Sequence, residues 1–386
     1  MAGRAHRIAV VIPKYGLVGG AEGFAAELTE RLARDPRWEF HVFANRWVPG
    51  SDRVAFHRVP IISFPKFLTT PSFAFFAGRR IRSTGIDIIH THDRIFRADL
   101  ATLHGVPHRF WIREVRRKGM SLYDRATARV EDNLVRDPRC RLFLPVSGLT
   151  EEIFIHEYGV APERVRVVHP GVDPARYEGL NRHLCREQIA GRFGIAPGER
   201  IILFVSMNFE IKGLDALMKG LAVLAGQPAA PPFRLLVAGK GNIRKYRKLA
   251  EALGIGGRII FTGVLSGADL PSLYMAADLY AMLSRFDTFG MVVLEAMAAS
   301  LPVLVSDRVG AKDLVRDGIN GFTIPADAEP EEIALKLASL LREEVRERMG
   351  RAARETAREN TWDTAAARVA AIYEELLRFR PGREGS

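Results

Sequence analysis

The chain has 386 residues, of which 47% are hydrophobic and 26% charged, a globular composition on a length that predicts two domains rather than one core. Its formal net charge of +11 favours an anionic partner, such as a phosphorylated substrate, nucleic acid or an anionic membrane surface. Two cysteines without metal-ligand or redox spacing argue against a disulfide scaffold, and no apolar stretch has the ~20 residues of a transmembrane helix.

The chain opens with a strand, a glycine-bearing loop and a helix. Residues 7–12 are apolar, Gly19 and Gly20 end the loop, and residues 21–33 have apolar side chains at helical spacing. This order is the first unit of a doubly wound parallel sheet. The glycines do not form G-x-G-x-x-G and no Walker loop occurs, so NAD and simple NTPase interpretations lose their main support.

Three histidines follow two predicted buried strands. Strand 86–90 leads into His90 and His92, and strand 100–104 ends at His104. Ligands of α/β sheets bind beyond the carboxyl ends of the strands, so a site is expected here. The two histidines at i, i+2 have no third ligand at convincing spacing, and we expect no metal. His90 and His92 are interpreted as structural.

Residues 109–137 predict one long, charged helix. The aromatic segment 64–76 before it is interpreted as a helix packed by its own aromatics rather than as a membrane contact. Residues 79–141 carry a local excess of positive charge, and its densest part lies at the start of the long helix, at Arg109, Arg113, Arg116, Arg117 and Lys118. Such a cluster suits a phosphorylated substrate or an anionic membrane, and the alternative is a solvated helix face.

The strand and helix pattern restarts in the second half. Strand 201–205 is followed by Asn208 and by Lys212-Gly213 at a helix start, and strand 234–238 ends at Gly239. We expect an N-terminal domain of residues 1–175 and a C-terminal domain of residues 176–358. A last helix, 359–380, is expected to cross back to the N-terminal domain, with a disordered tail at 381–386.

Residues 284–305 predict a polar loop, a helix and a buried strand. A helix that starts at Gly290 offers unpaired N–H groups to a phosphate, and Glu295 on that helix could accept hydrogen bonds from a ribose diol. Alternatively, Asp287 is an N-cap and Glu295 a solvated residue. Together with the lysine at position 212, the pattern indicates a nucleoside diphosphate ligand.

The sequence resembles the retaining glycosyltransferases of family 4, which have the GT-B fold. The resemblance covers nearly the whole chain, and the segment 99–118 is most similar to lipopolysaccharide-core glucosyltransferases that act on a heptose. Two departures stand out, because Asp287 replaces the usual Glu, and Met207 and Ile211 stand where an arginine is usual. The motifs that carry the resemblance are Gly19-Gly20, Val146-Ser147, Gly171-Val172-Asp173, Lys212-Gly213, Gly239-Lys240-Gly241, Phe261-Thr262-Gly263, Ala276-Ala277-Asp278, Asp287–Pro302 and Asp317–Gly321.

The resemblance implies an α/β GT-B protein with two doubly wound, Rossmann-like parallel-sheet domains facing each other across a cleft. The first would bind the acceptor and the second the nucleotide sugar. It further implies retaining transfer of a hexose, glucose from UDP-glucose, to a lipopolysaccharide-core sugar, with no metal and no cofactor. The alternatives are exopolysaccharide or glycolipid synthesis, and a catalytically silent protein that binds anionic lipid or nucleic acid.

The resemblance also implies roles for individual residues. The catalytic residues would be His104, Asp287 and Lys212. The partners would be the nucleotide-sugar donor, a lipid-linked or phosphorylated saccharide acceptor and an anionic membrane. Nucleic acid would not be a partner. The expected location is the cytoplasm, at the inner face of the membrane. The acceptor or the membrane would contact Arg109, Arg113, Arg116, Arg117 and Lys118. The donor would contact Gly19, Gly20, Asn208, Lys212, Gly239, Val264, Phe289, Gly290, Met291 and Glu295.

Overall fold

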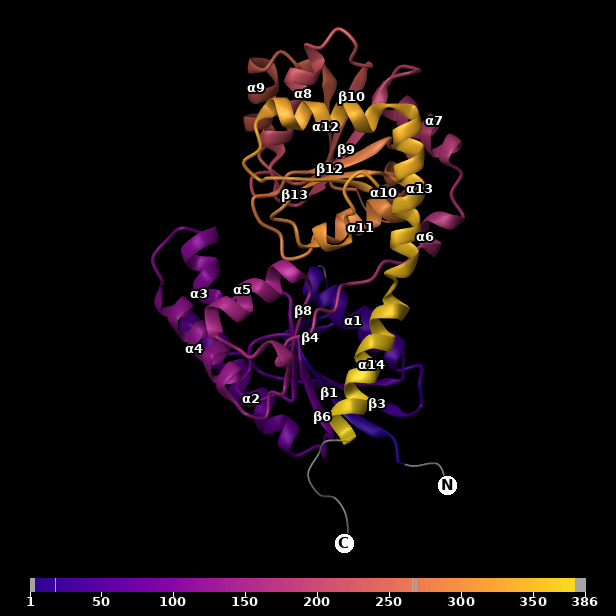
Figure 1. The fold of residues 1–386 in the computed structure, drawn as a ribbon. Helices are drawn as coiled ribbons and strands as arrows, with labels where there is room; N and C mark the ends of the chain where they lie inside the picture. The colour runs from indigo at the N-terminus through magenta and orange to yellow at the C-terminus, as the bar shows by residue number, and fades with distance from the viewer. Residues whose placement is uncertain (1–3, 18, 266, 268, 379–386) are drawn as a thin grey trace. The chain divides into compact units, whose positions relative to one another are not determined.

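The structure is a computed structural model that describes residues 4–17, 19–265, 267 and 269–378. The chain divides into two compact units (Figure 1), unit 1 with Met1–Gly171 and Trp362–Ser386, and unit 2 with Val172–Thr361. These boundaries differ by a few residues from those expected at 175 and 358. The Val172 N–H donates to the Asn360 carbonyl at 3.0 Å, which ties the two ends of unit 2 together. The tail expected at 381–386 lies outside the described residues.

Unit 1 is built on a six-stranded parallel sheet in the order β5-β3-β1-β6-β7-β8. The strand order reverses between β1 and β6, and ligands of such sheets bind beyond the carboxyl ends at this point. The strands are β1 (His6–Val11), β3 (Trp38–Ala44), β5 (Val54–Arg58), β6 (Ile88–Thr91), β7 (Leu100–Leu103) and β8 (Leu142–Pro145), and β2 (Lys14–Tyr15) pairs separately with β4 (Arg46–Trp47). The helices are α1 (Gly20–Leu32), η1 (Lys66–Leu68), α2 (Thr69–Arg82), α3 (His108–Phe110), the π-helical turn η2 (Trp111–Val115), α4 (Leu122–Arg136), α5 (Gly148–Tyr158), η3 (Pro162–Arg164) and α14 (Trp362–Arg378).

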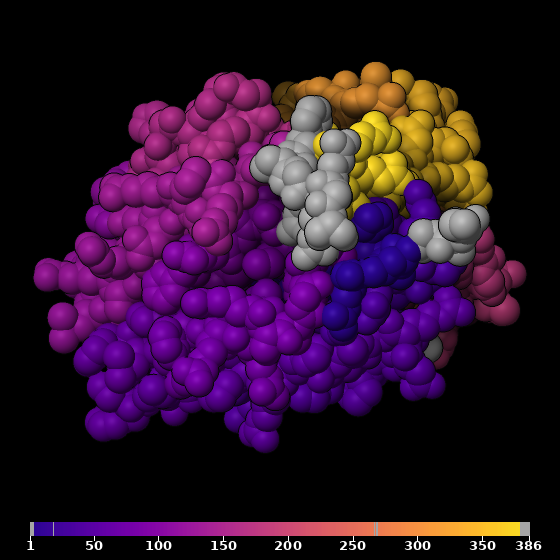
Figure 2. All heavy atoms as spheres, turned by 90° about the horizontal axis from the view of Figure 1, so that it is seen from below, coloured from indigo at the N-terminus to yellow at the C-terminus, as the bar shows by residue number. Residues whose placement is uncertain are grey.

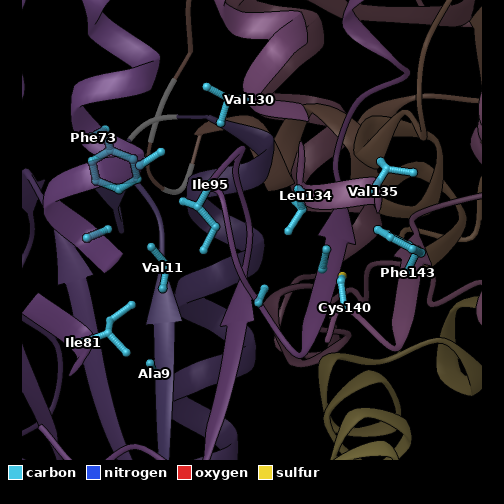
Figure 3. Close-up of a cluster of buried hydrophobic side chains, with 14 of the residues drawn as sticks. Ala9, Val11, Phe73, Ile81, Ile95, Val130, Leu134, Val135, Cys140 and Phe143 are labelled. Carbon is cyan, nitrogen blue, oxygen red and sulfur yellow. The ribbon is translucent and has the colours of Figure 1, made fainter. Parts of the chain in front are cut away.

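The core of unit 1 lies where α2 and α4 pack on the sheet (Figure 3). Burying a leucine or phenylalanine side chain contributes about 1.5–3 kcal/mol, so this cluster is a main source of the unit's stability. Burial also raises the pKa of the Cys140 thiol, which makes it an inert core residue. The buried members shown include Ala9 and Val11 of β1, Phe73 and Ile81 of α2, Val130, Leu134 and Val135 of α4, and Phe143 of β8.

Helix α14 completes unit 1, although it ends the described chain. It packs against α1 and β6, with Trp362 edge-on to Phe24 at 5.5 Å between ring centroids. Two ion pairs fasten its outer face, Glu374 with Arg37 at 2.7 Å and Glu375 with Arg166 at 2.5 Å. Figure 2 shows the N-terminal strand in indigo beside the yellow helix on this face. The helix therefore belongs to the same fold as the first strands.

Unit 2 repeats the architecture with the order β11-β10-β9-β12-β13-β14, all parallel, and the order reverses between β9 and β12. The two doubly wound sheets confirm the predicted fold class. The strands are β9 (Arg200–Ser206), β10 (Phe233–Gly239), β11 (Ile259–Gly263), β12 (Leu279–Met282), β13 (Val303–Ser306) and β14 (Gly321–Ile324). The helices are α6 (Ala175–Glu178), α7 (Arg182–Phe193), α8 (Leu214–Ala225), α9 (Ile243–Ala252), η4 (Gly256–Arg258), α10 (Asp269–Ala276), α11 (Met291–Ala298), η5 (Gly310–Leu314), α12 (Pro330–Leu341) and α13 (Glu343–Glu359).

The single helix predicted at 109–137 is wrong. The chain breaks after η2, where Arg117 has a positive φ of 48°, and α4 starts afresh at Leu122. A capping box starts it, because the Ser121 hydroxyl accepts from the Asp124 N–H at 3.2 Å while Asp124 accepts from the Ser121 N–H at 2.9 Å. The basic cluster therefore lies on a short helical turn and the loop after it, not along one helix face.

Candidate active site

The loops that follow β9 and β12 meet at the switch point of unit 2. The Arg285 N–H donates to the Ile211 carbonyl at 2.8 Å, which joins the two loops. Gly213 has a φ of +71°, and a Cβ at this position would lie 1.8 Å from the Leu283 carbonyl oxygen. Only glycine permits both the left-handed backbone and this approach. Gly213 therefore sets the start of α8 directly against the end of β12.

Lys212 and Asp287 contact each other across these loops. The Lys212 Nζ donates to the Asp287 Oδ2, and the two side chains are 22% and 16% exposed. The Asp287 backbone is fixed as well, since its N–H donates to the Arg308 carbonyl at 2.9 Å and its carbonyl accepts from the Gly310 N–H at 3.0 Å. The second carboxylate oxygen of Asp287 accepts from the Phe289 N–H at 3.3 Å. The lysine expected at the diphosphate and the carboxylate expected at the sugar are thus each other's partner here.

Helix α11 starts without a side-chain cap. Gly290 is its N-cap with a φ of +89°, and a Cβ there would lie 3.0 Å from the side chains of Met282 and Val309. The Val293 N–H already donates to the Gly290 carbonyl at 2.9 Å, and the Met291 and Val292 N–H groups ahead of it belong to the positive end of the helix dipole. This geometry can bind a phosphate oxygen.

Glu295 lies one turn further along α11 and is half-buried. The Tyr274 hydroxyl donates to its Oε2 at 3.0 Å. Burial raises the pKa of Glu295, while the Tyr274 hydrogen bond and the nearby Arg176 charge act in the opposite direction. Tyr274 is fully buried. It holds one carboxylate oxygen and leaves the other available as an acceptor, a contribution that no motif in the sequence indicated.

The loop after β10 packs on the end of β9. A Cβ at Gly239 would lie 1.8 Å from the Ser206 carbonyl oxygen, and the Lys240 N–H donates to that oxygen at 2.9 Å. Asn208 is exposed, and its side-chain oxygen accepts from the Ile211 N–H at 3.2 Å. Val264 is 59% exposed and follows the edge strand β11. The carboxyl ends of β9, β10 and β12 thus gather Asn208, Lys212, Gly239, Phe289, Gly290, Met291 and Glu295 at one edge of the sheet.

The other predicted site residues belong to unit 1. Gly19 and Gly20 are exposed at the start of α1, and no atom lies within 4 Å of a Cβ built on Gly20. His104 follows β7, edge-on to Phe24 at 4.9 Å. Burial lowers the pKa of His104 to about 3, so its imidazole is neutral at pH 7.

His92 decides the tautomer of His104. Its Nδ1 lies 3.0 Å from the His104 Nε2, and its own Nε2 is buried without a hydrogen-bond partner among the described residues. A hydrogen on that Nε2 would be a buried unsatisfied donor, which costs about 1–3 kcal/mol. We therefore assign the hydrogen to the His92 Nδ1. His104 then accepts through Nε2 and carries its own hydrogen on Nδ1.

Two family models match the chain, Glycosyltransferase Family 4 over residues 18–176 and Glycosyl transferases group 1 over residues 186–356. The chain belongs to the GT-B glycosyltransferases. An uncharacterized glycosyltransferase of Methanocaldococcus jannaschii is 26% identical over 95% of this chain and 97% of its own length. A D-inositol 3-phosphate glycosyltransferase of Corynebacterium glutamicum is 31% identical over 58% of this chain, and the match spans only 54% of that relative.

Solved structures show the same fold. WaaG, a glycosyltransferase involved in lipopolysaccharide biosynthesis, has a TM-score of 0.77 at 22% identity, covering 95% of this chain and 99% of its own. Anabaena HepE, solved with UDP and glucose, has a TM-score of 0.71 at 19% identity, covering 96% of this chain and 100% of its own. At these identities the likeness establishes the fold of the glycosyltransferase and leaves its substrates to be argued from its own residues.

The basic cluster of the glycosyltransferase splits in two. Arg109 is paired with Asp132, and Arg113 is paired with Glu114 and Glu157, both at 2.6 Å. The remaining side chains are exposed and have no ion-pair partner among the described residues. We call Arg116, Arg117 and Lys118 the basic loop.

Two broader searches of the described residues complete the description. Within residues 4–17, 19–265, 267 and 269–378, no group of three or more His, Cys, Asp or Glu side chains has the arrangement of a metal site. In the same part of the chain, no helix combines the length and apolar character needed to cross a membrane.

Proposed function

We propose that this glycosyltransferase moves a hexose from a nucleoside diphosphate sugar to a lipopolysaccharide-core sugar. The preferred donor in this proposal is UDP-glucose, so the transferred hexose is glucose. The transfer retains the anomeric configuration and uses no metal. The observation that carries the donor class is the Lys212–Asp287 pair beside the uncapped start of α11. Two proteins of the same fold support the choice of donor and pathway, HepE with its bound UDP and glucose and WaaG with its role in lipopolysaccharide biosynthesis.

The Lys212–Asp287 pair would act as an exchangeable contact. The bond from the anomeric carbon to the diphosphate breaks in the reaction, so negative charge grows on the phosphate oxygens. The first N–H groups of α11 would stabilise that charge from a fixed position, and the Lys212 ammonium would reach it by leaving Asp287. When the Lys212 ammonium turns to the diphosphate, the Asp287 Oδ2 is released and can accept a hydrogen bond from a hydroxyl of the donor sugar.

Glu295 would hold the ribose. Its Oε2 is occupied by Tyr274, which orients the carboxylate and leaves Oε1 to accept from a ribose hydroxyl. Charge-assisted hydrogen bonds of this kind are about twice as strong as neutral ones. The loop after Gly239 and the exposed Val264 would border the base, and Asn208 would help to bind the diphosphate. Gly19 and Gly20 would let the ligand approach the start of α1.

His104 would donate through Nδ1–H to the sugar and stabilise charge rather than act as a base. Its low pKa, about 3, excludes a charged imidazolium at neutral pH and makes it a poor proton acceptor. In the retaining step we propose, the bond from the acceptor oxygen to the anomeric carbon forms on the face from which the diphosphate leaves. The departing phosphate oxygen takes the proton of the acceptor hydroxyl, so no separate base is needed.

We also propose that unit 1 binds an anionic membrane at the inner face of the cytoplasmic membrane. The basic loop lies just before Leu122, which is 69% exposed. Lys66 lies over the Tyr123 ring at 5.1 Å, which places the exposed aromatics Phe67 of η1 and Phe64, two residues before η1, near the start of α4. Phe64 is 87% exposed. Exposed apolar side chains beside free cations suit a lipid surface, where each cation contributes about 1 kcal/mol.

Donor binding tests the first proposal. Isothermal titration with UDP-glucose, UDP-galactose, UDP-GlcNAc and GDP-mannose should give one saturable site, with UDP-glucose tightest. The Lys212→Ala variant should weaken it, and Lys219→Ala, which removes an exposed lysine of α8, should not. A folded protein that binds none of these donors would reject the donor assignment.

Vesicle co-sedimentation tests the second proposal. Replacing the three cations of the basic loop by Ser should lower binding to vesicles rich in phosphatidylglycerol. The matched control replaces Arg244, Lys248 and Arg351, three exposed cations of unit 2, by Ser and should leave binding unchanged. Equal binding by both variants would reject the membrane contact.

A further inference from the structure

Unit 1 contains a small cavity with a mixed polar and apolar lining that none of the residue roles above uses. Its volume is about 260 Å3. It lies at the carboxyl ends of β1 and β6, where Pro13 and Asp93 line it, and the start of α2 and α4 border it. At ~30 Å3 for each water, it has roughly the space of eight or nine waters, which suits one six-membered sugar ring rather than a larger ligand.

The cavity offers both hydrogen-bonding groups and an apolar surface. Thr70 and Thr127 contribute hydroxyls that are hydrogen-bonded to each other at 3.1 Å, and Tyr123 also lines the cavity. Phe73 adds an apolar ring on the same lining. A sugar ring likewise presents hydroxyls at its edge and C–H groups on its faces, so the lining matches both parts of such a ligand.

Asp93 and Arg94 form the charged part of the lining. The Asp93 Oδ1 accepts from the Arg94 backbone N–H at 2.6 Å, and it lies 3.8 Å from the Arg94 Nη1, too far for a hydrogen bond between the two side chains. The two side chains are therefore adjacent without a hydrogen bond between them, and Asp93 keeps its Oδ2 as a further acceptor. A carboxylate accepts and a guanidinium donates, so together they can bind two neighbouring hydroxyls of one ring.

Two carboxylates outside the cavity hold this lining in place. Glu131 is 9% exposed, and it accepts from the Arg94 Nε at 3.0 Å and from the His108 N–H at 2.7 Å. Asp124 lies 3.0 Å from the His108 Nε2. Glu131 also compensates the Arg94 charge, so the cavity has no unpaired cation to attract a phosphate. The site is preorganised for an uncharged ring.

We propose that this cavity binds one neutral hexose or heptose ring of the acceptor, with a vicinal diol held between Asp93 and Arg94. That the ring belongs to the acceptor rests on the proposed transferase function. That the ligand is a neutral sugar ring rests on the cavity alone. It places the phosphate groups of the acceptor outside the cavity.

Saturation-transfer NMR tests the ligand class without any donor, with methyl glucoside, methyl mannoside and glucose 6-phosphate as probes. A methyl glycoside should bind to the wild-type protein, and Asp93→Asn and Thr127→Val should each weaken that binding at least tenfold. Thr84→Val, a half-buried threonine outside the cavity, should leave it within twofold. Melting curves establish that each variant is folded, and a destabilised Asp93→Asn leaves Thr127→Val as the deciding variant. No binding of either methyl glycoside, unchanged binding by the folded variants, or a preference for glucose 6-phosphate would overturn the proposal.

Transfer kinetics separate this inference from the proposed function. Once an acceptor is turned over, Thr127→Val should raise the acceptor KM about tenfold and leave the Kd of UDP-glucose within twofold. An unchanged acceptor KM with intact donor binding would reject the proposed sugar site in the cavity and leave the proposed transferase function standing. If the wild-type protein binds methyl glycosides in the cavity but binds no nucleotide sugar, the proposed transferase function is rejected and the proposed sugar site stands.

Discussion

Replacing Lys212 by methionine removes its charge and keeps most of the side-chain volume. In the free protein the change leaves Asp287 without its cation in a place where its side chain is 16% exposed. Surface pairs contribute about 0–1 kcal/mol and breaking a fully buried pair costs 3–5 kcal/mol. The pair lies between these limits, so we expect the unfolding free energy of unit 2 to fall by about 1–3 kcal/mol.

The same substitution should weaken donor binding. Lys212→Met loses one charge-assisted contact to the diphosphate, worth about 1.5–3 kcal/mol, which corresponds to roughly a 10- to 150-fold increase in the Kd of UDP-glucose. Thermal unfolding and isothermal titration measure the two effects separately. Lys219→Met on the exposed side of α8 is the control for the loss of one charge.

A double-mutant cycle with Asp287→Asn completes the test. Since the two side chains contact each other, the stability losses of Lys212→Met and Asp287→Asn should not add, and the coupling should be about 0.5–3 kcal/mol. Additive stability losses, or a folded Lys212→Met variant whose UDP-glucose Kd changes less than threefold, would refute the account of the pair.

Three further predictions follow from other parts of the structure. Both ring nitrogens of His90 are hydrogen-bonded, Nδ1 with the Tyr373 hydroxyl and Nε2 with the Thr102 hydroxyl, at 2.7 Å each. Burial lowers the pKa of His90 to about 3. Because the folded state favours the neutral form of His90, the free energy of unfolding should fall as the pH drops from about 6.5 to about 3. Urea unfolding at several pH values measures this slope, and the His90→Gln variant should have a flatter one. An unchanged slope in that variant would contradict the burial argument. Gly213→Ala should lower the Tm clearly more than Gly318→Ala. Both glycines have a positive φ, but only a Cβ at Gly213 would meet the Leu283 carbonyl. Equal decreases in Tm would mean that this close approach does not matter. Transfer activity should survive EDTA, and a loss that magnesium restores would remove the metal-independent mechanism.

The sequence predicted the sheets well because their strands are buried on both faces. Strands β9 and β12 are runs of apolar residues bounded by turn residues, a pattern that local reading detects. The Lys212-Gly213 step was readable for a similar reason, since a lysine and a glycine directly precede the helix that follows β9. The close approach that requires this glycine was not, because it involves the carbonyl of Leu283 on another strand.

The pairing of side chains could not be predicted from local pattern. Lys212 and Asp287 are 75 positions apart and meet only because β9 and β12 are neighbours in the sheet. Tyr274 holds Glu295 from a different helix, which no spacing rule links to it. The break before α4 is a different case, since Ser121 and Asp124 form a capping box that is visible in the sequence and was outweighed by the charged helical pattern around it.

The central claim is that unit 2 binds a nucleoside diphosphate sugar through the start of α11 and Glu295. The most direct measurement is isothermal titration of UDP-glucose into the wild-type protein and into Glu295→Ala. The account predicts saturable binding at one site in the wild type and at least a tenfold weaker Kd in the folded variant. Binding of equal strength in both proteins would contradict it, because the carboxylate that Tyr274 orients would then not contact the donor.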